Sequence, residues 1–374
     1  MSVPPAASAR PPMPTGSPGN RSSDSGRIRA AAGAAARRFV LVFAGTLAAS
    51  WALVLALGLL TDPLASFGTG LLPPLVPNDR DFKATAYQRL LPRTEALILG
   101  SSRVMKIRPY CLQQITRVPA FNFGLNSARA EDDLAALRFA ESHGPVRWIL
   151  IGLDPEALHN SVKPDARLLD SRLLRSYVDP SLRLSLPHQL FSGAVAALSS
   201  ETVLASFRSI YYALGGRRLE PVYEFDSTGF LTHPLLERLV REGRFDQDTA
   251  VHQSIVEYRS RYAGFTRLSP VRVAALTRLL QSAWTGGARV DVFIPPLHPA
   301  LVRGMEGTTL AARTRDTEAL LSGFEQQGLL HFVRLPSLAS FNGDPALFFD
   351  GAHMMEANTA RVLSAVYGTG CAVH

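Results

Sequence analysis

The chain has 374 residues, of which 47% are hydrophobic and 19% are charged, so it can bury the core of one large domain with insertions or of two smaller domains. Its formal net charge at pH 7 is +8, but five of these charges arise in residues 1–38, where six arginines accompany a single aspartate. The sequence has no basic stripe with interleaved aromatic residues and no zinc or RNA-binding motif, which argues against a nucleic-acid partner.

The first predicted segment is a disordered tail over residues 1–36. Proline, serine, glycine and alanine dominate this stretch. It offers few large side chains whose burial could offset the entropy lost on ordering.

A transmembrane helix is predicted over residues 37–61. Residues 39–60, FVLVFAGTLAASWALVLALGLL, carry no charge, and at about 1.5 Å of rise per residue they cross a hydrocarbon core of about 30 Å. The apolar run is longer than the roughly 7–15 residues of a cleaved signal peptide. Its apolar character on every side argues against the remaining alternative, a buried core helix.

The charges around this segment predict its orientation. Arginines precede it and Asp62 follows it, so the positive-inside rule keeps the tail in the cytoplasm and residues 62–374 on the other side of the membrane. Arginine outnumbers lysine by 36 to 3 and alanine is abundant, which is typical of a GC-rich bacterial gene. We therefore expect a single-pass protein of the bacterial inner membrane with its main domain in the periplasm.

Residues 62–90 are predicted to be a linker, and residues 91–374 an α/β domain. Short apolar runs bounded by glycine and proline predict buried strands, and amphipathic patterns between them predict helices. The alternation of the two favours a mostly parallel sheet. The expected strands are 95–100, 119–124, 146–154, 288–296 and 330–336, and the expected helices are 109–115, 131–144, 269–287, 314–328 and 353–368.

The alternating pattern is interrupted at about residues 155–265. Helical pieces and one turn-rich stretch, EFDSTGFLTHP, occupy this region. We interpret it as a largely helical insertion after the third strand, which can form a wall or lid over a site.

Cys111 and Cys371 are the only cysteines. Their spacing matches neither a metal-ligand pattern nor a CxxC motif. We expect two packed or free thiols, with a disulfide as the alternative in an oxidising compartment. No His/Cys/Asp cluster has metal-ligand spacing, so neither a metal nor a cofactor is expected.

The first strand ends in an unusual turn, Gly100-Ser101-Ser102-Arg103. Ligands bind at the carboxyl ends of parallel strands, where a serine on a tight turn can serve as a nucleophile. The alternative is that Ser101 or Ser102 only caps the following helix, and the turn alone favours this alternative. A nucleophile also needs a base and a group that orients the base. Asp350 and His353, before the last helix, have the spacing for these two roles.

Together these segments resemble the SGNH (GDSL-type) hydrolases, whose fold is a flavodoxin-like three-layer α/β/α sandwich. Gly100-Ser101-Ser102 matches the family's Gly-Asp-Ser block, with serine in place of aspartate. Gly124 matches the glycine of the second block. Gly152-Leu153-Asp154 matches the third block, with aspartate in place of asparagine, and the Asp-x-x-His block matches Asp350 and His353 without change. The resemblance covers residues 91–154 and 286–367.

The sequence motifs GSSR, GLD and PPLHP most resemble those of a membrane-anchored, extracytoplasmic subset of that family. This subset includes proteins of alginate acetylation and the D-alanine-transfer protein of teichoic acids. The resemblance implies an acyltransferase that O-acylates, in the simplest case O-acetylates, an envelope or secreted polysaccharide. It also implies a multi-span membrane acyltransferase as the partner that supplies the acyl group.

By resemblance, Ser102 is the nucleophile, His353 the base and Asp350 the residue that orients it. The backbone N–H groups of Ser102 and Gly124 would bind the oxyanion. The family's third donor is an asparagine, but an ionised Asp154 can only accept hydrogen bonds.

Two alternatives resolve this departure at position 154. The amide of Asn126 can replace the missing donor, or Asp154 can pair with Arg103 and leave the backbone donors to suffice. We favour the second.

Other residues have two interpretations each. His298, at the end of the fourth strand, either contacts substrate or packs on neighbouring prolines. Tyr223, Phe225 and Phe230 in the insertion either stack on a sugar ring or pack internally, and packing is the commoner role.

Two further functions stay open at this stage. The same triad serves an esterase or deacetylase when water is the acceptor. A catalytically inactive relative that binds polysaccharide or organises an assembly is the third possibility, because positions 101 and 154 depart from the family pattern.

Overall fold

The computed structural model describes residues 21–63, 71–72, 75, 79–90, 94–161, 163–169, 171–180, 194–195, 197–215 and 223–371. The chain divides into two compact units, Met1–Ala56 and Leu57–His374, which are considered separately.

The N-terminal helix α1 (Arg21–Thr61) contains the predicted apolar span. Its portion Ala35–Thr61 has a mean hydropathy of 2.3 and is long and apolar enough to cross a membrane. The helix begins at Arg21, so the prediction of a disordered tail is wrong for residues 21–36, and residues 1–20 lie outside the described part of the chain. Alanine, the best helix former, fills much of this stretch, and adding residues to an existing helix is far easier than nucleating a new one.

A five-stranded parallel sheet forms the centre of the second unit, with strand order β2-β1-β3-β6-β7. All five strands lie where the sequence predicts them, and the α/β class with a mostly parallel sheet is confirmed. The strands are β1 (Ala96–Gly100), β2 (Ala120–Asn122), β3 (Trp148–Gly152), β6 (Arg289–Phe293) and β7 (His331–Val333). Parallel pairing brings the carboxyl ends of the strands to one edge, so that Gly100 lies beside Gly152.

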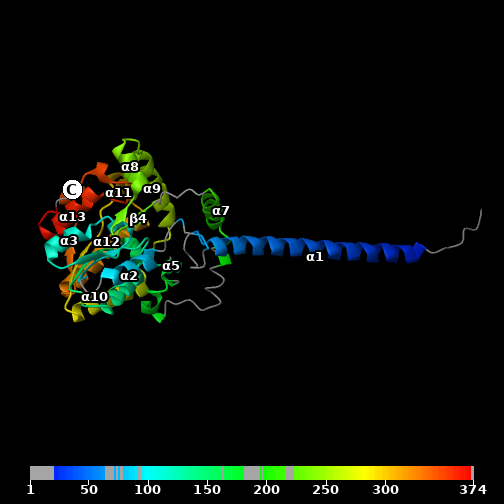
Figure 1. Ribbon diagram of the computed structural model, residues 1–374, viewed down its shortest axis with the longest axis horizontal. Coiled ribbons are helices and arrows are strands. Elements are labelled where there is room, and N and C mark those ends of the chain that lie inside the picture. Colours follow the sequence, from blue (N-terminus) through cyan, green and yellow to red (C-terminus); the bar gives the residue numbers. More distant parts are fainter. Residues whose placement is uncertain are drawn as a thin grey trace, which may run out of the picture. The chain divides into compact units, whose positions relative to one another are not determined.

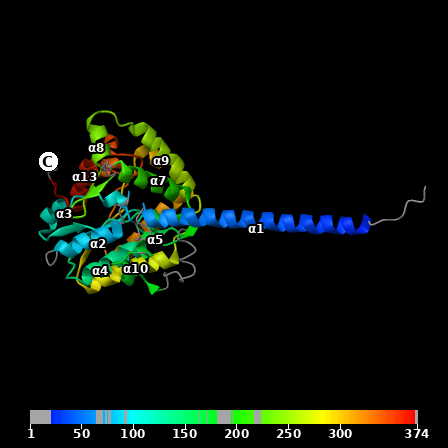
Figure 2. The same cartoon turned by 45° about the vertical axis from the view of Figure 1, so that its right-hand side comes forward.

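The five predicted helices are also present. They are α3 (Pro109–Thr116), α4 (Ala130–Glu141), α10 (Pro270–Thr285), α12 (Thr309–Gln326) and α13 (Glu356–Tyr367). Successive strand residues contribute to two separate cores because side chains alternate across a sheet. Leu97 and Leu99 of β1 join the core that includes α4, α10 and α12, whereas Ile98 joins the core that includes α3 and α13. Figures 1 and 2 show the helices around the sheet, with α4 and α10 side by side.

Helix α2 (Asp79–Leu90) corrects the prediction of a linker over residues 62–90. Its residues Ala84 and Tyr87 belong to the main core, and its charged residues Asp79, Arg80 and Lys83 are also buried. Periodicity could not identify this helix, because the side chains on its buried face are partly charged. They are buried because partners elsewhere in the chain satisfy them: Arg80 bonds Asp132 on α4, and the Lys83 ammonium donates to the Gly124 carbonyl at 2.6 Å.

The described residues between β3 and α10 form separate helices and a hairpin. The longest of these helices are α7 (Ser200–Leu214), α8 (Pro234–Arg241) and α9 (Gln247–Arg261). The turn-rich stretch forms a small antiparallel hairpin, β4 (Glu224–Phe225) with β5 (Leu231–Thr232). The other described elements of this region are η2 (Pro155–Leu158), α5 (Ala166–Leu169) and η3 (Arg175–Tyr177).

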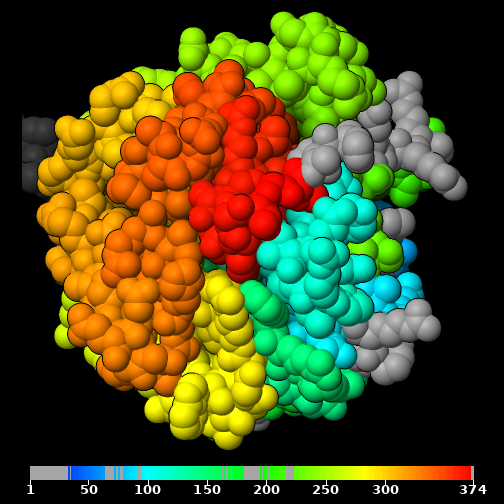
Figure 3. Space-filling model, turned by 90° about the vertical axis from the view of Figure 1, so that its left-hand side faces the viewer, coloured from blue at the N-terminus to red at the C-terminus, as the bar shows by residue number. Residues whose placement is uncertain are grey.

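Cys111 and Cys371 form a disulfide, although free or packed thiols were the favoured prediction. Cys111 belongs to α3 and Cys371 follows α13, and these two helices pack together. Figure 3 shows α13 (red) beside α3 (cyan) on one face of the molecule. The 260 residues that separate the cysteines hid this proximity from sequence reasoning.

Candidate active site

The turn after β1 explains the unusual strand ending. Gly100 has φ +130°, and a Cβ at this position would overlap with the carbonyl oxygen of Gly152 on β3, so only glycine fits. Ser101 then caps the short 3-10 helix Ser102–Val104, and its hydroxyl accepts from the Arg103 N–H at 3.2 Å. Of the two serines, Ser101 therefore performs the capping role and Ser102 is left to face the cavity.

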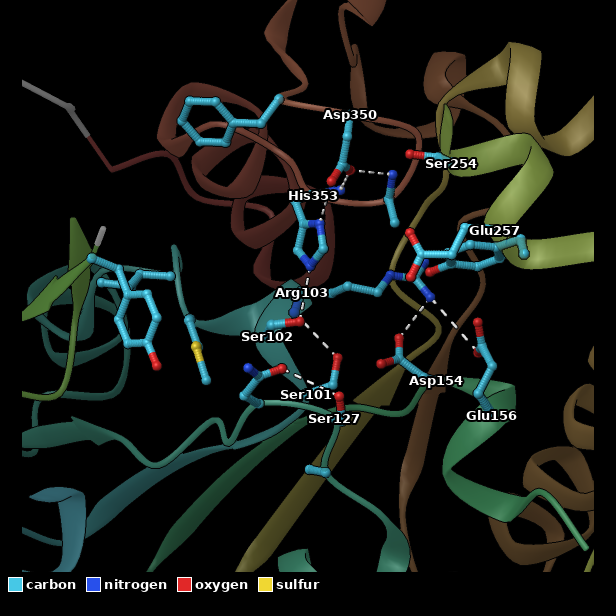
Figure 4. Close-up of a pocket in the computed structure, with 18 of the residues that line it drawn as sticks. Ser101, Ser102, Arg103, Ser127, Asp154, Glu156, Ser254, Glu257, Asp350 and His353 are labelled. Atoms are coloured by element: carbon cyan, nitrogen blue, oxygen red, sulfur yellow. Dashed lines mark hydrogen bonds and ion pairs between the residues drawn. The ribbon is translucent and has the colours of Figure 1, made fainter. Parts of the chain in front are cut away.

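Ser102, His353 and Asp350 form a continuous hydrogen-bonded line at the carboxyl edge of the sheet (Figure 4). Ser102 Oγ lies 2.9 Å from His353 Nε2, and His353 Nδ1 lies 2.8 Å from Asp350 Oδ2. The second carboxylate oxygen of Asp350 accepts from the backbone N–H groups of Ala352 and His353, both at 2.7 Å. These two backbone bonds fix the carboxylate, which in turn fixes the imidazole ring.

The pKa values of Asp350 and His353 are shifted in the directions that this hydrogen-bonded arrangement favours. Burial raises the pKa of Asp350, but the His353 imidazole and the backbone N–H bonds outweigh burial and lower that pKa to about 2. Burial lowers the pKa of His353, but the Asp350 carboxylate outweighs it and raises that pKa above its ordinary value of 6.5. A carboxylate that stays ionised therefore supports the positive charge that His353 acquires when it takes a proton.

Gly124 does not fill the role expected of it. Its N–H donates to Asn122 Oδ1 at 2.9 Å, and Gly124 is not among the residues that line the cavity. The Asn122 amide also binds the carbonyls of Val104 and Ile107, so Asn122 is committed to holding two loops. Position 124 requires a glycine because a Cβ there would lie only 2.8 Å from a Val104 methyl group.

Two other groups can donate to an oxyanion. Within the described residues, the Ser102 backbone N–H has no hydrogen-bond acceptor, and Ser102 lines the cavity. Asn126 also lines the cavity, and its Oδ1 accepts from the Ser127 hydroxyl at 3.2 Å, which leaves the amide N–H₂ group available. With the Gly124 N–H occupied, Asn126 becomes the better candidate for the second donor.

The backbone of Asn126 is held from both sides by charged residues that sequence reasoning missed. Its N–H donates to Asp79, and its carbonyl accepts from Arg80 at 3.0 Å and from Arg167 at 3.1 Å. Arg80 is fully buried, and Asp79 is 1% exposed. No local pattern points to this network, because its members lie on α2, on α5 and on the loop after β2.

Arg103 and Asp154 form the ion pair that was favoured from the sequence. Arg103 Nη1 lies 2.7 Å from Asp154 Oδ1, and both side chains are buried. The same guanidinium donates to the Pro295 carbonyl and lies 3.9 Å from the Glu156 carboxylate. Burial and the neighbouring Asp154 raise the pKa of Glu156 to about 7, although Arg103 opposes them. The pair ties the turn after β1 to the loops after β3 and β6.

The line of residues opens into a cavity of about 630 Å³, one wall of which comes from the region between β3 and α10. Tyr223 and Phe225 line this wall. Phe230 does not line it, because it is 2% exposed and packs against the Arg108 guanidinium. Further along, α9 contributes Tyr258 and Glu257, two lining residues that the sequence did not single out.

His298 is not among the residues that line the cavity. Its N–H donates to the Gly351 carbonyl at 2.9 Å, and its Nδ1 accepts from the Ala300 N–H at 3.2 Å, so His298 caps α11 (Pro299–Gly304). Its ring packs edge-on against Phe348. The structure therefore favours packing over substrate contact for this residue. In the described part of the chain, no group of three or more His, Cys, Asp or Glu side chains is placed to hold a metal ion.

The site thus combines a hydroxyl, an imidazole and a carboxylate in line with two candidate oxyanion donors, which is the equipment for nucleophilic acyl chemistry. No family model matches the chain, and the comparison with curated proteins gives no match.

Proposed function

We propose that this chain is a serine acyltransferase of the SGNH type that O-acylates an envelope or secreted polysaccharide. The observation that carries the proposal is the line from Ser102 through His353 to Asp350 at the carboxyl edge of a parallel sheet. The strand order is the 2-1-3-4-5 order of flavodoxin-like sheets when only its five strands are counted, which supports the three-layer fold expected of that family.

The reaction follows from the geometry in two halves. Ser102 Oγ attacks the donor's acyl carbon while His353 Nε2 takes the hydroxyl proton, and Asp350 stabilises the imidazolium. The Ser102 N–H and the Asn126 amide stabilise the oxyanion. When the bond to the leaving group breaks, His353 returns the proton to that group and an acyl ester remains on Ser102. His353 then takes the proton of an acceptor hydroxyl, whose oxygen attacks the acyl carbon. The bond from this carbon to Ser102 Oγ breaks, and His353 returns the proton to Ser102 Oγ, which regenerates the free hydroxyl.

A carbohydrate acceptor is supported by the walls of the cavity. The side chains of Tyr223, Phe225 and Tyr258 line it together with the charged Glu257 and Arg129. Aromatic faces provide area on which sugar rings can stack, and charged rims can bind their hydroxyl groups. A cavity of about 630 Å³ admits one or two sugar units of a longer polymer beside the acyl group.

A periplasmic location is supported by two independent features. The arginines before the apolar span favour a cytoplasmic N-terminus, and the Cys111–Cys371 disulfide is of the kind that persists in oxidising compartments. An acyl donor made in the cytoplasm must then cross the inner membrane. We therefore propose a multi-span membrane acyltransferase as the partner that delivers it.

An activity-based probe tests the nucleophile. The full chain in detergent should be labelled by a fluorophosphonate, and Ser102→Ala should abolish the label. Ser101→Ala is the matched control. It changes the adjacent serine, whose hydroxyl caps the turn and makes no hydrogen bond to His353, and it should keep the label. Folded protein that takes up no label would favour the inactive, polysaccharide-binding alternative.

The acceptor is tested with an acylated donor and an oligosaccharide. A mass gain on the sugar that depends on Ser102 supports transfer. Release of free acid without modification of the sugar would instead identify an esterase or deacetylase with the same triad.

A further inference from the structure

Helix α7 has its polar and apolar faces reversed relative to a helix of a water-soluble domain. Thr202, Ser206 and Ser209, which lie on one side of the helix, are all buried. The opposite stripe is apolar and exposed, and its members are Leu204, Phe207, Tyr211 and Leu214 with exposed fractions of 65%, 58%, 61% and 84%. A surface helix normally buries its apolar stripe and exposes its polar face. The reversal indicates that something other than water covers the stripe.

The buried small face of α7 packs on the last turn of α1. The Thr61 hydroxyl is hydrogen-bonded to Ser206 Oγ at 2.8 Å. A Cβ on Gly58 would lie 3.4 Å from a Thr202 methyl group and 2.8 Å from the Ala197 carbonyl, so Gly58 allows the backbones to approach closely. Small residues that bring two helices together in this way are typical of contacts at membrane depth.

The last turn of α1 is also the end of the apolar span Ala35–Thr61. Arg37 and Arg38 belong in the headgroup region on the cytoplasmic side, and about 20 residues suffice to cross the hydrocarbon core. Gly58 and Thr61 then reach the opposite bilayer surface. Because α7 contacts these two residues, an α1 that spans the bilayer brings α7 to that surface.

We propose that α7 is an interfacial membrane helix that inserts Leu204, Phe207, Tyr211 and Leu214 into the periplasmic leaflet beside the end of the anchor. Its length of 15 residues and its amphipathic character suit a helix that lies in the membrane surface. The proposal rests on the membrane placement of α1, but it does not depend on the proposed chemistry.

Fluorescence depth measurements test this placement in the full chain. Single cysteines at Phe207→Cys, Leu47→Cys and Val302→Cys would be labelled with an environment-sensitive fluorophore under non-reducing conditions, which leave the native disulfide intact. The chains would be reconstituted in phosphatidylcholine vesicles, with at most one chain per vesicle. Leu47 reports insertion of α1, and Val302 on α11 is an exposed apolar control, 49% exposed.

We expect blue-shifted emission at positions 207 and 47 and quenching of both by nitroxide-labelled lipids, whereas the label at position 302 stays in water. Emission at 207 equal to that at 302, while 47 is quenched, would overturn the proposal and leave the anchor intact. An unquenched label at position 47 would overturn both the membrane insertion of α1 and the placement of α7. A shift at 207 that appears only with several chains per vesicle would overturn the proposal in favour of contact with a second copy. Labelling of Ser102 by the fluorophosphonate is a separate readout of the proposed function.

Discussion

Ser102 Oγ and His353 Nε2 lie 2.9 Å apart although 251 residues separate them in the chain. The parallel sheet brings them together, because the turn after β1 and the loop before α13 both lie at its carboxyl edge. The contact also distinguishes Ser102 from its neighbour, whose hydroxyl is engaged in capping the turn.

Removal of the Ser102 hydroxyl is predicted to abolish acyl chemistry without unfolding the protein. Ser102→Ala should lower kcat by about 10⁴- to 10⁶-fold, as the loss of the nucleophile does in serine proteases. Ser101→Ala should retain most of kcat and cost about 0.5–2 kcal/mol of stability through loss of the cap. Steady-state kinetics and urea unfolding in detergent measure both effects. Equal loss of kcat in the two variants would contradict the assignment.

The pH profile is predicted from the two pKa shifts. His353 must be neutral to accept the Ser102 proton, and its pKa is raised above 6.5. The specificity constant kcat/KM should therefore rise with pH as His353 loses its proton, with a midpoint above pH 6.5, and activity should be lost at pH values below that midpoint. Asp350 stays ionised throughout this range, because its pKa is about 2.

Asp350→Asn removes the negative charge that raises the pKa of His353. Burial then dominates, so the acidic limb of the profile should move to lower pH, and kcat should fall by about 10⁴-fold. An acidic limb that does not move in this variant would show that another group controls the profile.

Asn126→Ala tests the side-chain oxyanion donor. Loss of one such donor typically lowers kcat by about 10²- to 10³-fold with little change in KM. Stability should change little, because the hydrogen bonds that hold this loop are made by the backbone of Asn126. If Asn126→Ala instead raised KM at constant kcat, the Asn126 amide would bind the substrate and the transition state equally, and it would not be an oxyanion donor.

Asp79→Ala is a companion variant for the positioning network. It removes the acceptor of the Asn126 N–H without touching the cavity, since Asp79 does not line it. We expect a smaller fall in kcat than for Asn126→Ala, accompanied by a loss of stability because Arg80 loses one of its carboxylate partners. In the double variant the two effects on kcat should not add, because both act through the same amide.

Asp154→Asn introduces the asparagine that SGNH hydrolases have in the third block, yet it is predicted to destabilise the protein. The substitution leaves Glu156, 3.9 Å away, as the remaining carboxylate partner of the buried Arg103, so it should cost about 3 kcal/mol of stability. Glu242→Gln is the control, because it breaks an exposed pair with Arg244 and should cost less than about 1 kcal/mol. Urea unfolding compares the two variants. A more stable and faster Asp154→Asn enzyme would contradict the structural role given to the pair.

Loss of the Cys111–Cys371 bond is predicted to lower stability by about 2–5 kcal/mol, because the bond closes a long loop and restricts the unfolded chain. The double substitution Cys111→Ser with Cys371→Ser can be compared with the parent in urea. A maleimide added to denatured, unreduced protein should find no free thiol. Labelling of both cysteines under these conditions would contradict the disulfide.

The sequence by itself determined the elements of the sheet. Apolar runs of six to nine residues and the amphipathic helices between them are properties of short windows, so the five strands and the five helices around them could be located from local patterns. The apolar span could also be located from the sequence alone. So could the pairing of Asp350 with His353, because these residues are only three positions apart. By contrast, the turn alone left Ser101 and Ser102 as alternatives. The family resemblance favoured Ser102, and only the tertiary structure shows its hydroxyl beside His353, a residue far along the chain.

Long-range pairing decided the rest. Arg80 and Lys83 look exposed in the sequence, but acceptors from other elements make their burial favourable, and so a predicted linker became helix α2. Gly124 lost its expected role because Asn122 occupies its N–H, and Cys111 met Cys371 because α3 packs on α13. Hydrogen bonds, ion pairs and disulfides act over a few ångströms of space regardless of separation along the chain. Their partners therefore become known only when the chain is folded.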